Sequence, residues 1–479
     1  MLKDIAWTTV GQVGSQAIQI VTTLILARFL VPNDFGLIGI STLFYGLAST
    51  VNQLGFTGAI VHRPNLSDLH LSSCFLVNLG FSLVTALITL LLAGEIARFF
   101  HAPEGQRIIE SFSVLFIFGG LRTVQLALLV RSLSFRFLAF LALGEVFLQG
   151  LIAVPMAAVG FGAWSIVIGR LIASGSMTLC LWLSSSWRPK FRYSRTHFAE
   201  IFSFGRASLG SNLLTYAIQN VDNLIVGRTL GTASLGIYGM AYNLATVPTQ
   251  KISSIISLVA FPKFSREAEL KNVKLKYESI LATLSSVTFP ILVGGAILAR
   301  PAIIGLVGNK WEDAIIPFQI LCIAGSVKSL TATVGSVFQS QGKPQREFLL
   351  DLLSIILMVF FLLAGMRWGI KGVAAGVAFH SVIMMLFFMS GVARILKTKF
   401  GPLVGKVLPS AIASMGMGIP LWFVYTIFLN KLSPWVSLGL IPPLGILIYY
   451  LFMRNLYPSR LEPLLNVMRK IFGNNAASV

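Results

Sequence analysis

The chain has 479 residues, of which 55% are hydrophobic and only 11% are charged, and its mean hydropathy is +0.81. Soluble domains carry about 25% charged residues, so this composition indicates an integral membrane protein and excludes soluble enzymes and DNA-binding domains. The formal charge of +20 then indicates Lys and Arg gathered in membrane-protein loops rather than a nucleic-acid partner.

Fourteen apolar runs are long enough to cross a membrane as helices. A span takes about 20 mostly apolar residues, because lipid offers no hydrogen-bond partner to the backbone. The predicted spans are residues 5–27, 36–60, 72–94, 111–130, 138–159, 162–184, 204–227, 236–261, 279–299, 314–338, 348–366, 372–392, 405–428 and 434–454. The even number places both termini on one side of the membrane.

The loop charges predict which side that is. Most of the 37 Lys and Arg residues fall in loops on the side of the termini, among them Arg188, Lys190, Lys274 and Lys276. Cytoplasmic loops carry an excess of Lys and Arg, so we expect both termini in the cytoplasm. Residues 456–479 are expected to form an amphipathic tail helix on the inner surface.

The chain repeats itself at an offset of 200 residues. The repeat pairs Ala17 with Ala217, Ile18 with Ile218, Gln19 with Gln219, Arg28 with Arg228, Gly36 with Gly236 and Gly39 with Gly239. Because it joins the first span to the seventh, the two copies enter the membrane in the same direction and form parallel repeats. We therefore predict an all-α membrane fold with two pseudo-symmetric six-helix lobes. The expected divisions are an N-lobe at 1–200, a C-lobe at 201–395, two extra spans at 396–455 and the tail at 456–479.

Polar residues follow one face of the first span, and the seventh span repeats them. The stripes are Thr8, Gln12, Ser15, Gln19 and Thr22 in the first copy and Ser208, Asn212, Thr215, Gln219 and Asp222 in the second. Such side chains can simply bond neighbouring helices. Two stripes in register favour instead a shared water-filled cleft. Gln12, Gln19, Gln219 and Asp222 are therefore candidate substrate-binding residues, and Asn212 a further cavity residue.

Six ionisable side chains fall well inside the predicted spans: Arg122, Glu145, Arg170, Asp222, Lys251 and Lys328. A charge at that depth is costly, so each is expected in a cavity or an ion pair. The excess of cations favours an anionic substrate, with Arg122, Arg170, Lys251 and Lys328 as candidate binding residues and Glu145 as a further cavity residue. Alternatively, Arg122 or Arg170 pairs with Glu145 only to hold the first lobe together.

Motifs for other chemistries are absent. The sequence has no Walker phosphate-binding loop, and its three cysteines have no metal-ligand spacing. We predict no catalytic residue, metal or cofactor, which leaves a secondary transporter. Whether transport is coupled to a gradient of H+ or Na+ stays open.

Two stretches resemble bacterial polysaccharide flippases. Residues 219–231 (QNVDNLIVGRTLG), followed by Leu235, Gly236, Tyr238, Gly239, Tyr242 and Pro248, are similar to the span 7 and 8 signature of that family. Ala27-Arg28-Phe29-Leu30 with Phe35-Gly36 is similar to its first span pair. The chain is identified as a member of the Wzx-type flippases, nearest the colanic acid exporter branch, in the MOP superfamily that also holds multidrug exporters and lipid II flippases. It departs from lipid II flippases, which concentrate arginines in their first two spans, because this chain has only Arg28 there, at the outer rim. This difference argues against a peptidoglycan precursor as the substrate.

The resemblance implies a function at the bacterial inner membrane. An undecaprenyl-diphosphate-linked oligosaccharide, the repeat unit of an exopolysaccharide or O-antigen, would move from the cytoplasmic to the periplasmic leaflet by alternating access. Expected partners are this lipid-linked oligosaccharide, membrane lipids and a polysaccharide polymerase with its co-polymerase, but no nucleic acid. Two alternatives are a MATE-like multidrug or cation exporter and a non-transporting scaffold of a polysaccharide synthesis complex.

Overall fold

The protein is described from a computed structural model that places residues 2–52, 58, 60–61, 63, 65–267, 269–429 and 432–458. Within these ranges every regular element is a helix, and each of the fourteen predicted spans overlaps one. The predicted all-α membrane fold is therefore confirmed. Residues 459–479, most of the predicted tail helix, lie outside the described ranges.

Eleven helical segments in the described part of the chain are long and apolar enough to cross a membrane. One of them, Pro344–Ile395, contains two predicted spans as the separate helices α13 (Pro344–Gly365) and α14 (Gly369–Ile395). The seventh and eighth predicted spans both lie in α8 (Arg195–Ser265). The chain is thus a multi-pass membrane protein.

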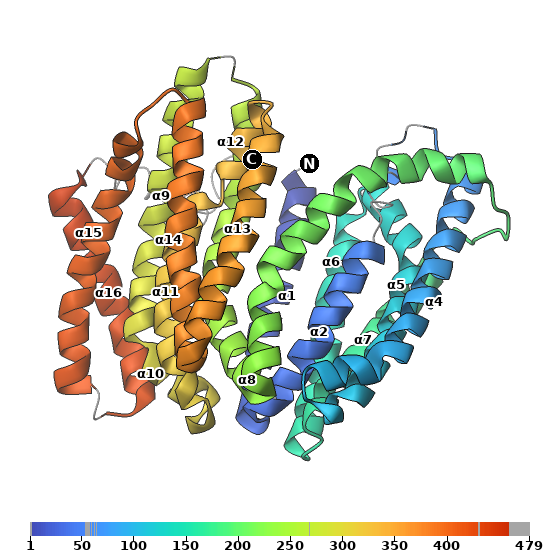
Figure 1. Cartoon of the computed structure of the whole chain (residues 1–479), viewed down its shortest axis with the longest axis horizontal. Coiled ribbons are helices and arrows are strands. Elements are labelled where there is room, and N and C mark those ends of the chain that lie inside the picture. The colour runs from blue at the N-terminus through green and yellow to red at the C-terminus, as the bar shows by residue number, and fades with distance from the viewer. Residues whose placement is uncertain are drawn as a thin grey trace. The chain divides into compact units, whose positions relative to one another are not determined.

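The chain folds into two compact units, and the first is Met1–Gly239. Its helices are α1 (Leu2–Phe29), α2 (Pro32–Asn52), α4 (Asp68–Phe99), α5 (Gln106–Arg131), α6 (Phe135–Ala158), α7 (Ala163–Ser184) and the first arm of α8. Helix α4 packs along α5, and α6 packs along both α1 and α7 (Figure 1). The side chains of Leu26, Phe75 and Phe112 are almost fully buried between these helices.

Helix α4 begins where the sequence supplies a cap. The Ser67 hydroxyl accepts a hydrogen bond from the backbone N–H of His70, and the His70 ring accepts one from the backbone N–H of Ser67. This reciprocal pair satisfies two donors at the start of the helix. It also fixes His70 at the loop end of α4.

Helix α8 is broken at Gly231, where φ is 85° and ψ is 175°. Residues with a side chain rarely adopt this conformation, whereas glycine does so at little cost. Gly231 therefore joins two helical arms, residues 195–230 and 232–265, without a loop. The first arm belongs to the first unit and most of the second arm to the second unit.

Two glycines related by the sequence repeat make the same contact from opposite sides. A Cβ atom added to Gly36 would lie 1.9 Å from the backbone oxygen of Thr232, and one added to Gly236 would lie 1.9 Å from the backbone oxygen of Pro32. Only glycine lets the backbones approach so closely. The offset of 200 residues thus appears as a reciprocal contact between the start of α2 and the start of the second α8 arm.

The second unit is Met240–Val479. Besides the rest of α8, α13 and α14, it contains α9 (Leu270–Ile297), α10 (Ala299–Ala302), α11 (Ile315–Thr331), α12 (Val334–Ser340), α15 (Phe400–Val424) and α16 (Pro434–Leu456). Helix α9 packs along α15, and α14 packs along both α11 and α13. Phe264, Tyr277 and Phe338 are fully buried in its core.

Candidate functional site

Two charges inside the first unit form an ion pair. One guanidinium nitrogen of Arg122, on α5, donates to both carboxylate oxygens of Glu145, on α6, at 3.2 and 3.1 Å. The two side chains keep 26% and 30% of their surface exposed. Sequence analysis left open whether Arg122 or Arg170 pairs with Glu145, and in the structure Arg122 forms the ion pair.

The other arginine of this unit is held by aromatic rings. Arg170, on α7, places its guanidinium carbon 5.1 Å from the ring centre of Tyr45 and 5.1 Å from that of Phe112. Such cation–π contacts stabilise the cation while leaving its N–H donors available at the edges. No carboxylate in the described ranges forms an ion pair with Arg170. Arg170 is therefore a cation with donors available for an anion.

A polar cavity of about 240 Å³ lies beside these charges, between α2, α4 and α5. We call it the Asn cavity. The residues that give it its character are Tyr45, Asn52, Asn78, Ser82, Phe116 and Arg122. It therefore combines amide and hydroxyl groups with an aromatic wall and one side of the Arg122–Glu145 pair.

The predicted polar stripes divide into exposed and buried members. Gln12, Gln19, Asn212 and Gln219 are exposed. Asp222 is buried, and its carboxylate accepts a hydrogen bond from the Tyr238 hydroxyl at 2.8 Å and another from the backbone N–H of Asn223 at 2.8 Å. The second stripe thus ends in a bonded carboxylate rather than an exposed one.

Of the two predicted cations of the second half, the structure describes one side chain. The Lys328 ammonium, on α11, donates to the Tyr242 hydroxyl at 3.3 Å and lies 5.2 Å from the Tyr242 ring centre. Lys251 lies in α8, and its side chain is outside the described part of the structure. Arg122 of the fourth predicted span and Lys328 of the tenth therefore differ in partner: Arg122 binds a carboxylate and Lys328 a phenol.

The second unit has a larger hollow of about 550 Å³ between α9, α11 and α15, which is open on one side because the side chains of Ile323, Ile419 and Trp422 in its lining are more than half exposed. We call it the apolar cavity. Its lining includes Leu292, Ile297, Ile323, Ile419, Trp422 and Phe423. The Ser326 hydroxyl, which also lines it, donates to the backbone oxygen of Cys322 at 3.0 Å. The surface offered to a ligand is thus almost wholly hydrocarbon.

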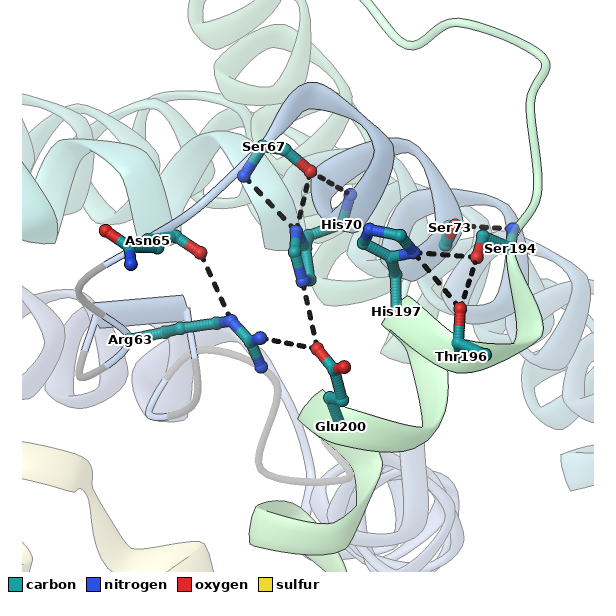
Figure 2. A network of polar contacts seen from close by, with 9 residues as sticks. All are labelled: Arg63, Asn65, Ser67, His70, Ser73, Ser194, Thr196, His197 and Glu200. Carbon is teal, nitrogen blue, oxygen red and sulfur yellow. Dashed lines mark hydrogen bonds and ion pairs between the residues drawn. The ribbon is translucent and has the colours of Figure 1, made fainter.

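A network of polar contacts ties the first turns of α8 and the loop before them to the start of α4 (Figure 2). Glu200 accepts hydrogen bonds from Arg63 and from the His70 ring, the latter at 3.2 Å. The backbone N–H of Ser194 donates to the Ser73 hydroxyl at 3.0 Å. The hydrogen bond from His70 and the positive charge of Arg63 hold the pKa of Glu200 below its usual value. We call these five residues the α4–α8 latch.

Sequence reasoning found the charges and missed their surroundings. Tyr45, Asn52, Asn78 and Ser82 were not singled out, because isolated residues of these types are ordinary in membrane helices. In the described ranges, no group of three or more His, Cys, Asp and Glu side chains could hold a metal ion.

Comparison with known proteins identifies related sequences. The family model described as "Polysaccharide biosynthesis protein" matches residues 25–316. The lipopolysaccharide biosynthesis protein WzxC of Escherichia coli (strain K12) is 24% identical over 427 residues, which cover 87% of each chain. The teichuronic acid biosynthesis protein TuaB of Bacillus subtilis (strain 168) is 24% identical over 426 residues, 88% of each chain. Similarity to these relatives therefore extends through most of both units.

Solved structures of two transporter types share the fold. The lipid II flippase MurJ, in an inward closed conformation, matches with a TM-score of 0.76 and 17% identity over 95% of this chain and 99% of its own. An inward-facing multidrug resistance MATE family transporter of the MOP superfamily matches with a TM-score of 0.61 and 15% identity over 81% and 99%. The fold is therefore that of the MOP transporters.

Proposed function

This chain belongs to the family of polysaccharide biosynthesis proteins, and we propose that it flips an undecaprenyl-diphosphate-linked oligosaccharide across the bacterial inner membrane. It is a membrane transporter and not an enzyme. Its substrate would be the repeat unit of an exopolysaccharide or O-antigen, moved from the cytoplasmic to the periplasmic leaflet.

The proposal rests on one observation: in the described ranges, the Arg170 guanidinium has no carboxylate partner. A diphosphate needs positively charged donors, and a guanidinium matches the geometry of phosphate oxygens. Arg170 is held between two rings and has no carboxylate partner in the described ranges. A cation exporter would need a free carboxylate at this place, whereas Glu145 is already bound by Arg122. The charge arrangement therefore favours the diphosphate substrate over a multidrug exporter.

The two cavities support an amphipathic substrate. The polar Asn cavity suits a glycan, and the apolar cavity suits a prenyl chain, because its lining is as apolar as the lipid tails that surround such a chain in the membrane. In the transport cycle that we propose, the lobes alternate in access. Cations attract the diphosphate, Gln12, Gln19 and Gln219 bond the sugars, and the prenyl chain remains among apolar groups. An H+ or Na+ gradient would supply the energy, and a polymerase with its co-polymerase would receive the product.

Lipid-linked glycan analysis in a strain lacking this protein tests the proposal. Accumulation of the glycan on the cytoplasmic face is expected, and the normal gene should relieve it. Arg170→Gln should restore export poorly and Arg170→Lys better, because lysine keeps the charge. Lys328→Gln and Lys251→Gln test the second half in the same assay. A strain without accumulation would contradict the flippase, and normal export by Arg170→Gln at normal protein level would support the scaffold alternative.

Reporter fusions test the proposed orientation. Fusions after Arg192 and after Lys276 should report cytoplasm, and one near Lys310 should report periplasm. A reversal at any of these positions would contradict the placement of both termini in the cytoplasm.

A further inference from the structure

We propose that the Asn cavity is a subsite for the sugar joined directly to the diphosphate, an inference that rests on the function proposed above. Water in the liquid occupies about 30 Å³ per molecule. A cavity of about 240 Å³ therefore replaces about eight waters, which is room for one monosaccharide ring. Arg122, which lines the cavity, keeps 26% of its side-chain surface exposed.

Two buried amides point to a ligand that both donates and accepts hydrogen bonds. Asn52 bonds the Thr85 hydroxyl at 3.2 Å, and Asn78 bonds the backbone oxygen of Gly120 at 3.4 Å. Each amide has a donor end and an acceptor end, so each uses one end on the protein and has its other end without a protein partner in the described ranges. Their side chains are nearly inaccessible from outside, and both line the cavity. Buried polar groups are normally satisfied, and sugar hydroxyls satisfy either end.

The charges around the cavity favour a neutral ligand. Arg122 carries a full charge, but Glu145 binds it through both carboxylate oxygens. The pair is neutral overall, so it adds little attraction for an anion or a cation. The guanidinium nitrogens that do not face Glu145 can still donate to a hydroxyl. This surrounding fits a polyhydroxyl group better than a phosphate or a metal ion.

An aromatic wall connects the cavity to Arg170. The Tyr45 ring lies 4.9 Å from the Phe116 ring, centre to centre, and both line the cavity. The same Tyr45 ring carries the Arg170 guanidinium at 5.1 Å. A diphosphate bound at Arg170 would therefore place its attached sugar next to the cavity. Sugar rings present C–H faces that pack on aromatic rings, while their hydroxyls reach polar groups.

Binding to the full-length protein in lipid nanodiscs tests the subsite. The probes are bare undecaprenyl diphosphate and the same lipid carrying one glucose, one galactose or one N-acetylglucosamine. At least one glycosylated lipid should bind about tenfold more tightly than the bare lipid, the gain expected from two or three hydrogen bonds. Asn52→Ala and Asn78→Ala should each remove most of that gain and leave the affinity for the bare lipid unchanged.

A cavity-filling variant tests the subsite without removing a hydrogen bond of the protein, which the two asparagine variants do. Gly119 lines the cavity, and a Cβ atom there would meet no atom within 4 Å, so Gly119→Leu should fold and fill the space. Gly80→Leu is the matched control, because Gly80 also has open space around it, is exposed and does not line the cavity. Gly119→Leu should lose the sugar-dependent gain, and Gly80→Leu should keep it.

The outcomes separate this inference from the proposed function. Equal affinity for bare and glycosylated lipids, or variants that weaken both equally, would overturn the subsite while the diphosphate flippase stands. Failure of every lipid to bind would overturn the proposed function itself.

Discussion

The Asn cavity and the apolar cavity each lie beside the third and fourth spans of their half and have opposite chemistry, although α2 completes the first and α15, one of the two extra spans, completes the second. The third and fourth spans of the first half, α4 and α5, wall the Asn cavity, and the third and fourth spans of the second half, α9 and α11, wall the apolar cavity. Amides, hydroxyls and an arginine line the first, whereas leucine, isoleucine and aromatic side chains line the second. Repeated helices thus preserve a scaffold while their lining residues set what each half can bind.

The largest expected effect comes from breaking the apolar character of the second half. Ile419→Asp places a carboxylate in the apolar cavity, which costs about 2.5–3.5 kcal/mol near a span centre. We expect loss of glycan export, measured with the lipid-linked glycan assay and corrected for protein level. Ile419→Leu should export normally. Ser49→Asp, at the Asn cavity, should retain most export, and an equal loss in both aspartate variants would remove the distinction between the cavities.

A cysteine at the Asn cavity should react with a thiol reagent at least about tenfold faster than one at the apolar cavity, because an apolar lining gives water no hydrogen-bond partner. Ser49→Cys probes the Asn cavity and Ser326→Cys the apolar cavity, and both positions are half-buried. In a background without Cys74, Cys180 and Cys322, a charged thiol reagent should label position 49 faster. Similar labelling rates would mean that water fills both.

The ion pair of the first half should appear as a coupling of about 1 kcal/mol. Glu145→Gln leaves the half-buried Arg122 without its carboxylate partner. This single variant should therefore unfold at a lower temperature than the double variant Arg122→Gln/Glu145→Gln, in which neither charge remains. Thermal unfolding of the four proteins in detergent gives the double-mutant cycle. Strictly additive effects would show that the pair contributes no coupling.

The smallest expected effect is a pH dependence of stability that comes from one paired carboxylate in each unit. A depressed pKa means that the Glu200 carboxylate stabilises the folded state at neutral pH and loses that contribution as the pH falls through its folded pKa. The Tm difference between the normal protein and Glu200→Gln should therefore shrink between pH 7 and about pH 3.5. Glu267 in the second unit, whose pKa is lowered mainly by its hydrogen bond from Lys276, should behave alike in Glu267→Gln. A Tm difference that stays constant between pH 7 and about pH 3.5 would show that these carboxylates are not paired in solution.

The spans could be predicted because a membrane imposes one simple requirement on them. Apolar length alone located fourteen helical segments, and the charges at Arg122, Glu145 and Arg170 stood out against that background. Their partners could not be predicted, because pairing depends on how each helix is rotated about its axis.

Other features leave no distinct pattern in the sequence. Asn52 and Asn78 are single polar residues in apolar runs, and only packing of α2 against α4 and α5 brings them together. The apolar cavity could not be predicted from the sequence, because side chains that face lipid and side chains that line this cavity are both apolar. The glycines at 231 and 236 likewise did not indicate that the seventh and eighth predicted spans form one helix that is broken at Gly231.

The reciprocal contact of Gly36 and Gly236 has the form of an isologous dimer interface. Gly36 contacts Thr232 as Gly236 contacts Pro32, so the glycine of each copy contacts the other copy at the position that corresponds to Pro32. A chain of half this length that formed a symmetric homodimer would make the same contact twice, and one substitution would alter both contacts. In the joined chain each contact is encoded separately. The sequences of the two halves can therefore change independently, and one can become polar where the other becomes apolar.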